Sequence, residues 1–288
     1  MTLFPKEEDK AKLLSCIETT NNFVLLTTGR AGTDFLQSCY DSHPQVASTC
    51  EKSFSLAEFI SKNYSLIPHS VELFSALALE QLKFSFAPYL NEIEDWRIAY
   101  NDNYRKANIH KFIDTLCYLL ICKGKEPNYL HICRSIIIAF AYSSNQNIEQ
   151  IKTILIHLHH IPQLKFYSNY LGPKDLILIC SRSIYSLVSS GVFHRRKYWF
   201  NRKEYHLSLD LGHYRRVYNR VVFDYIDVND SNSSDSAKLF LVMLENLGKI
   251  ENLNSINRVL NIDEFKNYPG STVLGINRRG DQLSSDIR

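Results

Sequence analysis

A short loop near the start of the chain holds residues that could bind an anion. Residues 27–33 read Thr-Thr-Gly-Arg-Ala-Gly-Thr. Gly29 and Gly32 permit backbone angles that other residues avoid, so successive N–H groups can converge on one oxyanion. Arg30 adds a guanidinium group that is always charged and carries several N–H donors. Thr33 adds a hydroxyl that could cap a following helix or contact the anion. The loop therefore predicts a site for a phosphate-like group.

The segments on either side of this loop predict a strand and a helix. Residues 23–26, Phe-Val-Leu-Leu, form an apolar run that suits a buried parallel strand. After the loop, a helical spacing gathers apolar side chains on one side, namely Phe35, Leu36, Cys39 and Tyr40. This order would place the anion at the positive end of the helix. The GxxxxGK[ST] pattern of ATP- and GTP-binding loops does not fit these residues, which disfavours ordinary nucleoside triphosphate chemistry.

The loop and the residues after it resemble the 5′-phosphosulfate loop of sulfotransferases that use 3′-phosphoadenosine 5′-phosphosulfate (PAPS). In that family a strand leads into a [KR]-x-G-[ST] loop and a helix, often followed by Leu-Asp-x-His-Pro-x-Val. The corresponding segment here is Tyr40-Asp41-Ser42-His43-Pro44-Gln45-Val46. The glycan-modifying and tyrosylprotein branches resemble the chain most, because a glutamate follows their His-Pro pair. Glu51 occupies that place.

The resemblance implies that the loop and the first helical turn bind the donor. The implied contacts are Thr28, Gly29, Arg30, Ala31, Gly32, Thr33, Asp34 and Phe35. Asp34 departs from the family, in which many relatives carry a second Ser or Thr. Since a carboxylate beside a phosphate is unfavourable, we expect Asp34 to contribute its backbone N–H or to cap the helix. For Phe35, stacking on adenine and packing in the core are equally open alternatives.

A second cofactor segment is implied after a later strand. Residues 175–181 predict a strand that leads into Arg182, with Ser190 about two helical turns further on. In the family an arginine and a serine placed in this way bind the 3′-phosphate, and the spacing would put both on one helix face. Near the end of the chain, Arg278, Arg279 and Gly280 resemble the basic loop that folds over the same phosphate, although the tryptophan-containing continuation is missing.

The resemblance also implies which residues do the chemistry. Glu51 would be the general base, and Arg30 would stabilise the sulfuryl oxygens and the leaving phosphate. The alternative for Glu51 is a strand-end carboxylate paired with Lys52. His159 or His160 could replace the basic residue that relatives carry before a proline, although a hydrogen-bonded strand-end histidine is an equal alternative. Metal binding by these histidines is disfavoured, because no Cys, Asp or Glu cluster completes a ligand set.

The rest of the pattern predicts a single α/β domain over residues 1–288, with a P-loop-like central parallel sheet flanked by helices. Residues 53–142 read as a helical insertion and are our candidate acceptor-binding region. Further strands are predicted over residues 46–50, 153–158 and 238–244, with a lead-in helix over 6–19 and a long helix over 206–228. The second of these strands is expected in the middle of the sheet.

Composition narrows the class of protein. The net charge is only +3, although residues 194–216 form a basic stretch, and seven cysteines form no CxxC pair. Reduced, buried thiols and the lack of an apolar signal or spanning segment favour a cytoplasmic protein. We expect PAPS and an acceptor as partners, with no nucleic acid and no membrane span. The acceptor is predicted to be a carbohydrate hydroxyl or amine, with a secondary metabolite or tyrosyl peptide as alternatives. A P-loop kinase or a non-catalytic anion-binding protein are alternatives of another class.

Overall fold

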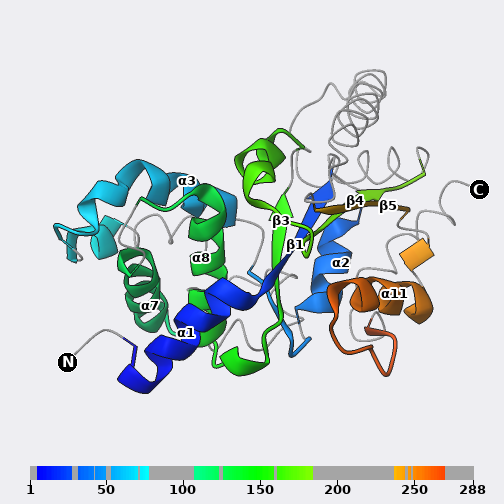
Figure 1. Cartoon of the computed structure of the whole chain (residues 1–288), viewed down its shortest axis with the longest axis horizontal. Helices are drawn as coiled ribbons and strands as arrows, with labels where there is room; N and C mark the ends of the chain where they lie inside the picture. Colours follow the sequence, from blue (N-terminus) through cyan, green and yellow to red (C-terminus); the bar gives the residue numbers. More distant parts are fainter. Residues whose placement is uncertain are drawn as a thin grey trace, which may run out of the picture.

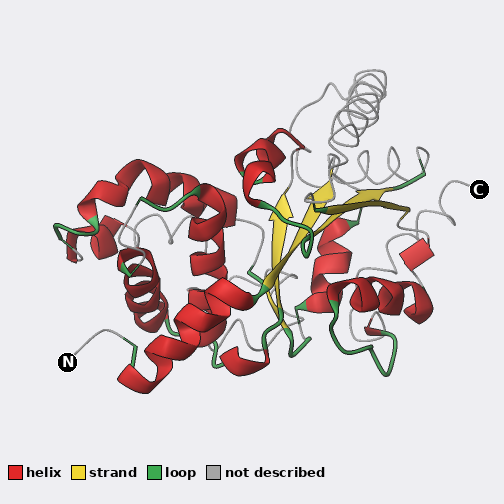
Figure 2. Cartoon of the chain, in the orientation of Figure 1, coloured by secondary structure: helices red, strands yellow, loops and turns green. Residues whose placement is uncertain are grey.

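The computed structural model contains a five-stranded parallel sheet with helices on both faces (Figures 1 and 2). It describes residues 5–27, 32–41, 43–49, 53–70, 72–77, 107–122, 126–158, 161–183, 237–243, 246–247 and 249–269. The strands are β1 (Asn21–Thr27), β2 (Val46–Ala47), β3 (Thr153–Leu158), β4 (Leu176–Ser181) and β5 (Lys238–Met243). The predicted α/β class with a parallel sheet is confirmed. The loop after β1 lies outside the described residues, so its P-loop-like form stays a prediction.

The strands lie in the order β2-β3-β1-β4-β5, and every neighbouring pair is parallel. The apolar run of β3 predicted an inner strand, and β3 is indeed paired on both sides, but β1 holds the middle position. The predicted strand over residues 46–50 is shorter, because the ladder of β2 covers only Val46 and Ala47.

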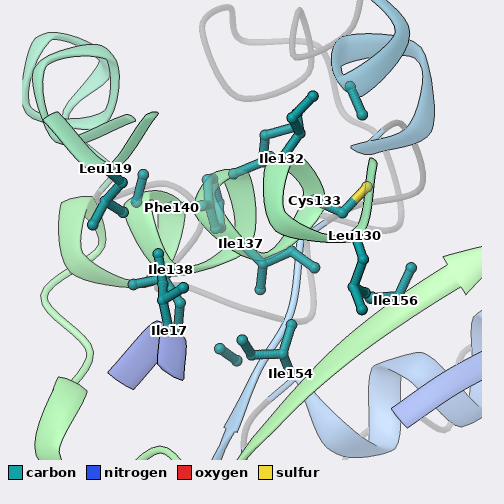
Figure 3. Packing of buried hydrophobic residues seen from close by; sticks show 14 of the residues in the cluster. Ile17, Leu119, Leu130, Ile132, Cys133, Ile137, Ile138, Phe140, Ile154 and Ile156 are labelled. Carbon is teal, nitrogen blue, oxygen red and sulfur yellow. The ribbon is translucent and has the colours of Figure 1, made fainter. Parts of the chain in front are cut away.

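One face of the sheet is covered by α1 (Glu7–Thr19), α3 (Ser53–Asn63) and α8 (Tyr129–Ser143), and α7 (Ile109–Ile121) packs against α8. Alternate strand residues such as Val24, Ile154 and Ile156 join the core on this side. Figure 3 shows Leu130 and Ile137 of α8 directed towards the strand that carries Ile154 and Ile156. Helices α3, α7 and α8 fall in the region where the sequence predicts a helical insertion, and in the described residues α3 and α8 join α1 in burying this face.

The other face is covered by α2 (Thr33–Tyr40) and α11 (Ile250–Leu260). The intervening strand residues, among them Phe23 and Leu155, pack here against the apolar side of α2. The side chains that predicted this helix, Phe35, Leu36, Cys39 and Tyr40, are all buried. The helix runs from the carboxyl edge of the sheet to the amino edge, so its first residue comes after the predicted anion-binding loop and its last lies beside the start of β2.

Candidate functional site at the carboxyl edge of the sheet

The two segments predicted to bind the donor come directly after neighbouring strands. β1 and β4 are adjacent and parallel, with Thr27 opposite Cys180. The chain leaves β1 towards β2 on one side of the sheet, whereas it leaves β4 towards β5 on the other. In open α/β sheets, ligands bind where the connections diverge in this way, outside the carboxyl ends of the strands. The predicted anion-binding loop follows β1, and Arg182 follows β4. Both therefore come directly after the two strands at whose ends this topology favours a ligand.

Gly32 has the backbone conformation that the sequence predicts for the loop. It precedes α2 as its N-cap, with φ 83° and ψ 19° in the left-handed region. A residue with a Cβ would be disfavoured there by about 1–2 kcal/mol. The Gly32 carbonyl accepts from the Leu36 N–H at 3.1 Å, and this is the first hydrogen bond of the helix. Since the first N–H groups of a helix have no partner within it, the start of α2 has donors and a partial positive charge that suit an anion.

The first turn of α2 is packed into the protein. Thr33 is 3% exposed, and Phe35 is 6% exposed within the core on the α2 face. The structure thus favours the core role of Phe35 over adenine stacking. Arg182 comes directly after β4 and is half-buried.

Several predicted site residues lie outside the described part of the chain. They are Thr28, Gly29, Arg30, Ala31, Glu51, His159, His160, Ser190, Arg278, Arg279 and Gly280, together with the side chain of Asp34. The predicted helix over residues 206–228 also lies there. Their roles remain predictions.

A buried network of hydrogen bonds near the carboxyl edge of the sheet was not predicted from the sequence. Nδ1 of His157 in β3 lies 2.6 Å from Oε1 of Gln37 in α2, and Nε2 of Gln37 donates to the Thr49 carbonyl. His157, Gln37 and Thr49 are only 3%, 5% and 4% exposed. The sequence carries no clear signal for it, because the helical spacing puts Gln37 on the polar side of α2 with Thr33 and Asp34. A buried amide is stable only if its hydrogen bonds are made.

The His-Pro segment that carried the family resemblance forms a clamp at the opposite edge. The Gln45 N–H donates to Nδ1 of His43 at 3.2 Å, so the proton is on Nε2, which donates to the Asp263 carbonyl at 3.0 Å. Burial lowers the pKa of His43 below its ordinary value, while the hydrogen bond to Asp263 opposes the shift. Asp41 accepts from the Ser48 hydroxyl. In the described residues, this motif joins the α2–β2 turn to the segment after α11.

Among the described residues, no group of three or more His, Cys, Asp or Glu side chains is arranged to hold a metal ion. No helix among the described residues has the length and apolar character needed to span a membrane.

Comparisons with protein-family models, with curated proteins and with solved structures found no match for this chain. The functional argument consequently rests on the residues and on their placement in the sheet.

Proposed function

We propose that the protein is a sulfotransferase that transfers a sulfuryl group from PAPS to a hydroxyl or amine of an acceptor. The observation that carries the proposal is the pairing of β1 with β4 at the divergence of the sheet connections. Thr27 and Cys180 are register partners, so the anion loop and Arg182 begin next to each other at the ligand-binding edge. A donor with phosphates at both ends needs two anion sites of this kind.

The proposed chemistry is an in-line displacement at sulfur. The acceptor oxygen or nitrogen forms a bond to sulfur as the bond from sulfur to the bridging phosphate oxygen breaks. The acceptor proton passes to Glu51, and the negative charge that develops on the leaving 3′,5′-ADP is stabilised by Arg30 and by the N–H groups at the start of α2. Arg182 and Ser190 would hold the 3′-phosphate, with Arg278, Arg279 and Gly280 closing over it.

The proposed acceptor is a carbohydrate, bound in part by residues 53–142. We also propose that the protein works in the cytoplasm. This location is supported by the cysteines that the structure describes. Five of them are buried free thiols, namely Cys16, Cys39, Cys117, Cys133 and Cys180, and burial raises the pKa of each to about 12. Buried thiols of this kind suit a reducing compartment.

Ligand-dependent melting tests the donor site. At about 100 times its Kd, 3′,5′-ADP should raise the melting temperature by about 4–5 °C, because a ligand bound only to the folded state stabilises it by about 2.7 kcal/mol. ATP with Mg²⁺ should have little effect. Stabilisation by ATP–Mg²⁺ alone would favour a kinase and contradict the proposal.

Replacement of the proposed base separates an enzyme from a binding protein. Glu51→Gln should keep the shift with 3′,5′-ADP and lower the transfer rate from labelled PAPS by about 10²–10⁴-fold, as expected for loss of a general base. The matched control is Glu264→Gln, which changes an exposed carboxylate after α11 that pairs with Arg258, outside the proposed acceptor region. Acceptors from sugars, tyrosyl peptides and small phenols would be compared in the same assay. Unchanged transfer in Glu51→Gln would remove Glu51 from the mechanism.

A further inference from the structure

Gln37 is the point where three chain segments meet under the carboxyl edge. It belongs to α2, contacts the end of β3 through His157, and contacts the chain beyond β2 through Thr49. The Thr49 carbonyl can only accept, so the amide nitrogen of Gln37 must face it and the amide oxygen must face the histidine. His157 must then carry a proton on Nδ1. One amide thus fixes the protonated nitrogen of a buried imidazole and the position of a backbone carbonyl.

The Thr49 carbonyl lies beyond the end of the β2 ladder. Residue pairing with β3 ends at Ala47, opposite Ile154. A buried carbonyl beyond the ladder needs a donor from elsewhere, because an unsatisfied one costs about 1–3 kcal/mol. The Gln37 side chain provides that donor. The direction in which the chain leaves β2 is therefore set by a side chain of α2.

We propose that Gln37 is a positioning residue that couples the anion-binding end of α2 to the segment leaving β2. Gln37 lies one helical turn after Thr33, so the helix that begins at the loop also holds the peptide of Thr49. Glu51 is the second residue after Thr49 in the sequence. The catalytic part of this inference rests on the proposed function, since it makes Gln37 responsible for holding the chain just before the proposed base.

Two substitutions separate the hydrogen bonds of Gln37. In Gln37→Glu, a carboxylate can still accept from His157 but cannot donate to Thr49, so two acceptor oxygens face each other. Gln37→Met keeps a similar length and removes both bonds. The control is Tyr40→Phe, because Tyr40 is a fully buried residue of the same helix whose hydroxyl donates to Asn257 at 2.7 Å.

Hydrogen exchange and nitrogen-15 NMR of the full chain test the coupling without any assay of activity. Both Gln37 variants should speed amide exchange at Ser48 and Thr49 by about tenfold relative to wild type, whereas Tyr40→Phe should leave it unchanged. The ring nitrogens of His157 should show Nδ1–H in wild type and in Gln37→Glu, with a change only in Gln37→Met. Exchange in both Gln37 variants that equals wild type, or a wild-type His157 protonated on Nε2 alone, would overturn the proposal.

Kinetics then test the catalytic part. Both Gln37 variants should lower kcat by about 10²-fold and leave KM for PAPS within about twofold, since the donor site is intact and the base is misplaced. An equal loss of kcat in Tyr40→Phe would assign the effect to general weakening of α2 and overturn the proposal. If wild type shows no melting shift with 3′,5′-ADP, the sulfotransferase proposal fails, and the exchange and NMR results still decide the role of Gln37.

Discussion

The two edges of the sheet use polar residues in different ways. At the amino edge, the Asp175 carboxylate accepts from the backbone and side-chain N–H groups of Asn22 at 2.7 and 2.9 Å and from the Gly172 N–H at 2.8 Å. Arg134 of α8 donates to Asn22 at 3.1 Å, to the carbonyl and hydroxyl of Thr20 at 2.9 Å, and to the Ile17 carbonyl. Polar groups here bind one another and join α1, β1, α8 and β4.

At the carboxyl edge, the buried hydrogen-bond network lies beneath the surface and holds the backbone that follows β2. Gln37 and His157 contact each other, and Gln37 also contacts the Thr49 carbonyl, while the predicted donor contacts lie in the segments beyond the strand ends. The difference fits the proposed function, in which the amino edge stabilises the fold and the carboxyl edge orients residues for a ligand. Substitutions at the amino edge should therefore change stability alone, and those at the carboxyl edge should change binding or rate.

The largest expected effect is at the amino edge. Arg134→Met should lower the free energy of unfolding by about 2–3 kcal/mol, because it leaves several buried acceptors without a charged donor. Urea unfolding measures this loss, and affinity for 3′,5′-ADP should not change. The control Arg258→Met removes an exposed arginine that pairs with Glu264 and should cost less than about 0.5 kcal/mol. A loss of affinity for 3′,5′-ADP in folded Arg134→Met would contradict the claim that the amino edge affects stability alone.

Arg182→Met tests the carboxyl edge with the same chemical change. If Arg182 binds the 3′-phosphate, its loss should weaken 3′,5′-ADP binding by about 10–100-fold, as expected for a charge-assisted contact. The free energy of unfolding should fall by less than about 1 kcal/mol, since Arg182 is half-buried at a strand end. Isothermal titration and urea unfolding measure the two quantities. A large stability loss with unchanged affinity would place Arg182 with the structural residues.

The His43 clamp predicts a pH effect on stability. The folded state lowers the pKa of His43, so the unfolded chain binds more protons once the pH falls below the ordinary value of 6.5. The stabilisation is complete above that pH and is lost as the pH falls towards the lowered folded value. The groups facing the ring are Asp263, whose carbonyl it contacts, and Lys152, whose charge also lowers the pKa.

Urea midpoints between pH 7.5 and 5.5 measure this effect. His43→Asn should remove part of the acid sensitivity, whereas the exposed control His69→Asn should keep it. Equal acid sensitivity in wild type and His43→Asn would show that the clamp does not titrate with folding.

The smallest expected effect is that of Tyr40→Phe. It removes one hydrogen bond, from Tyr40 to Asn257, and should cost about 1 kcal/mol with no change in transfer rate. Tyr170→Phe is the control, because Tyr170 is 52% exposed. A changed transfer rate in Tyr40→Phe would extend functional sensitivity to the amino edge.

The sequence predicted the strands well because buried parallel strands are continuous apolar runs. β3 was predicted with the bounds that the structure has, and β4 and β5 within one residue at an end. β2 was predicted too long, because residues 48 and 49 bind Asp41 and Gln37 instead of continuing the ladder. The sequence pattern does not show that these hydrogen bonds to side chains replace hydrogen bonds between strands.

The polar networks could not be predicted because their partners are distant in the sequence. Gln37 meets His157 and Asn22 meets Asp175 only once β3 and β4 have been placed on either side of β1. Glycine requirements are local, and the left-handed backbone of Gly32 agrees with the prediction at that position, while residues 28–31 lie outside the described part of the chain. The resemblance placed the His-Pro segment next to a functional loop, whereas the structure gives His43 a structural contact.

The position of β1 has a consequence for synthesis on the ribosome. β1 emerges well before both of its neighbours, which come from residues 153–158 and 176–181. At about 5–20 residues per second, the strand would wait on the order of ten seconds for its first partner. During that interval an apolar segment has no sheet to join, so this chain should depend on a chaperone during translation more than one whose first strands pair with each other.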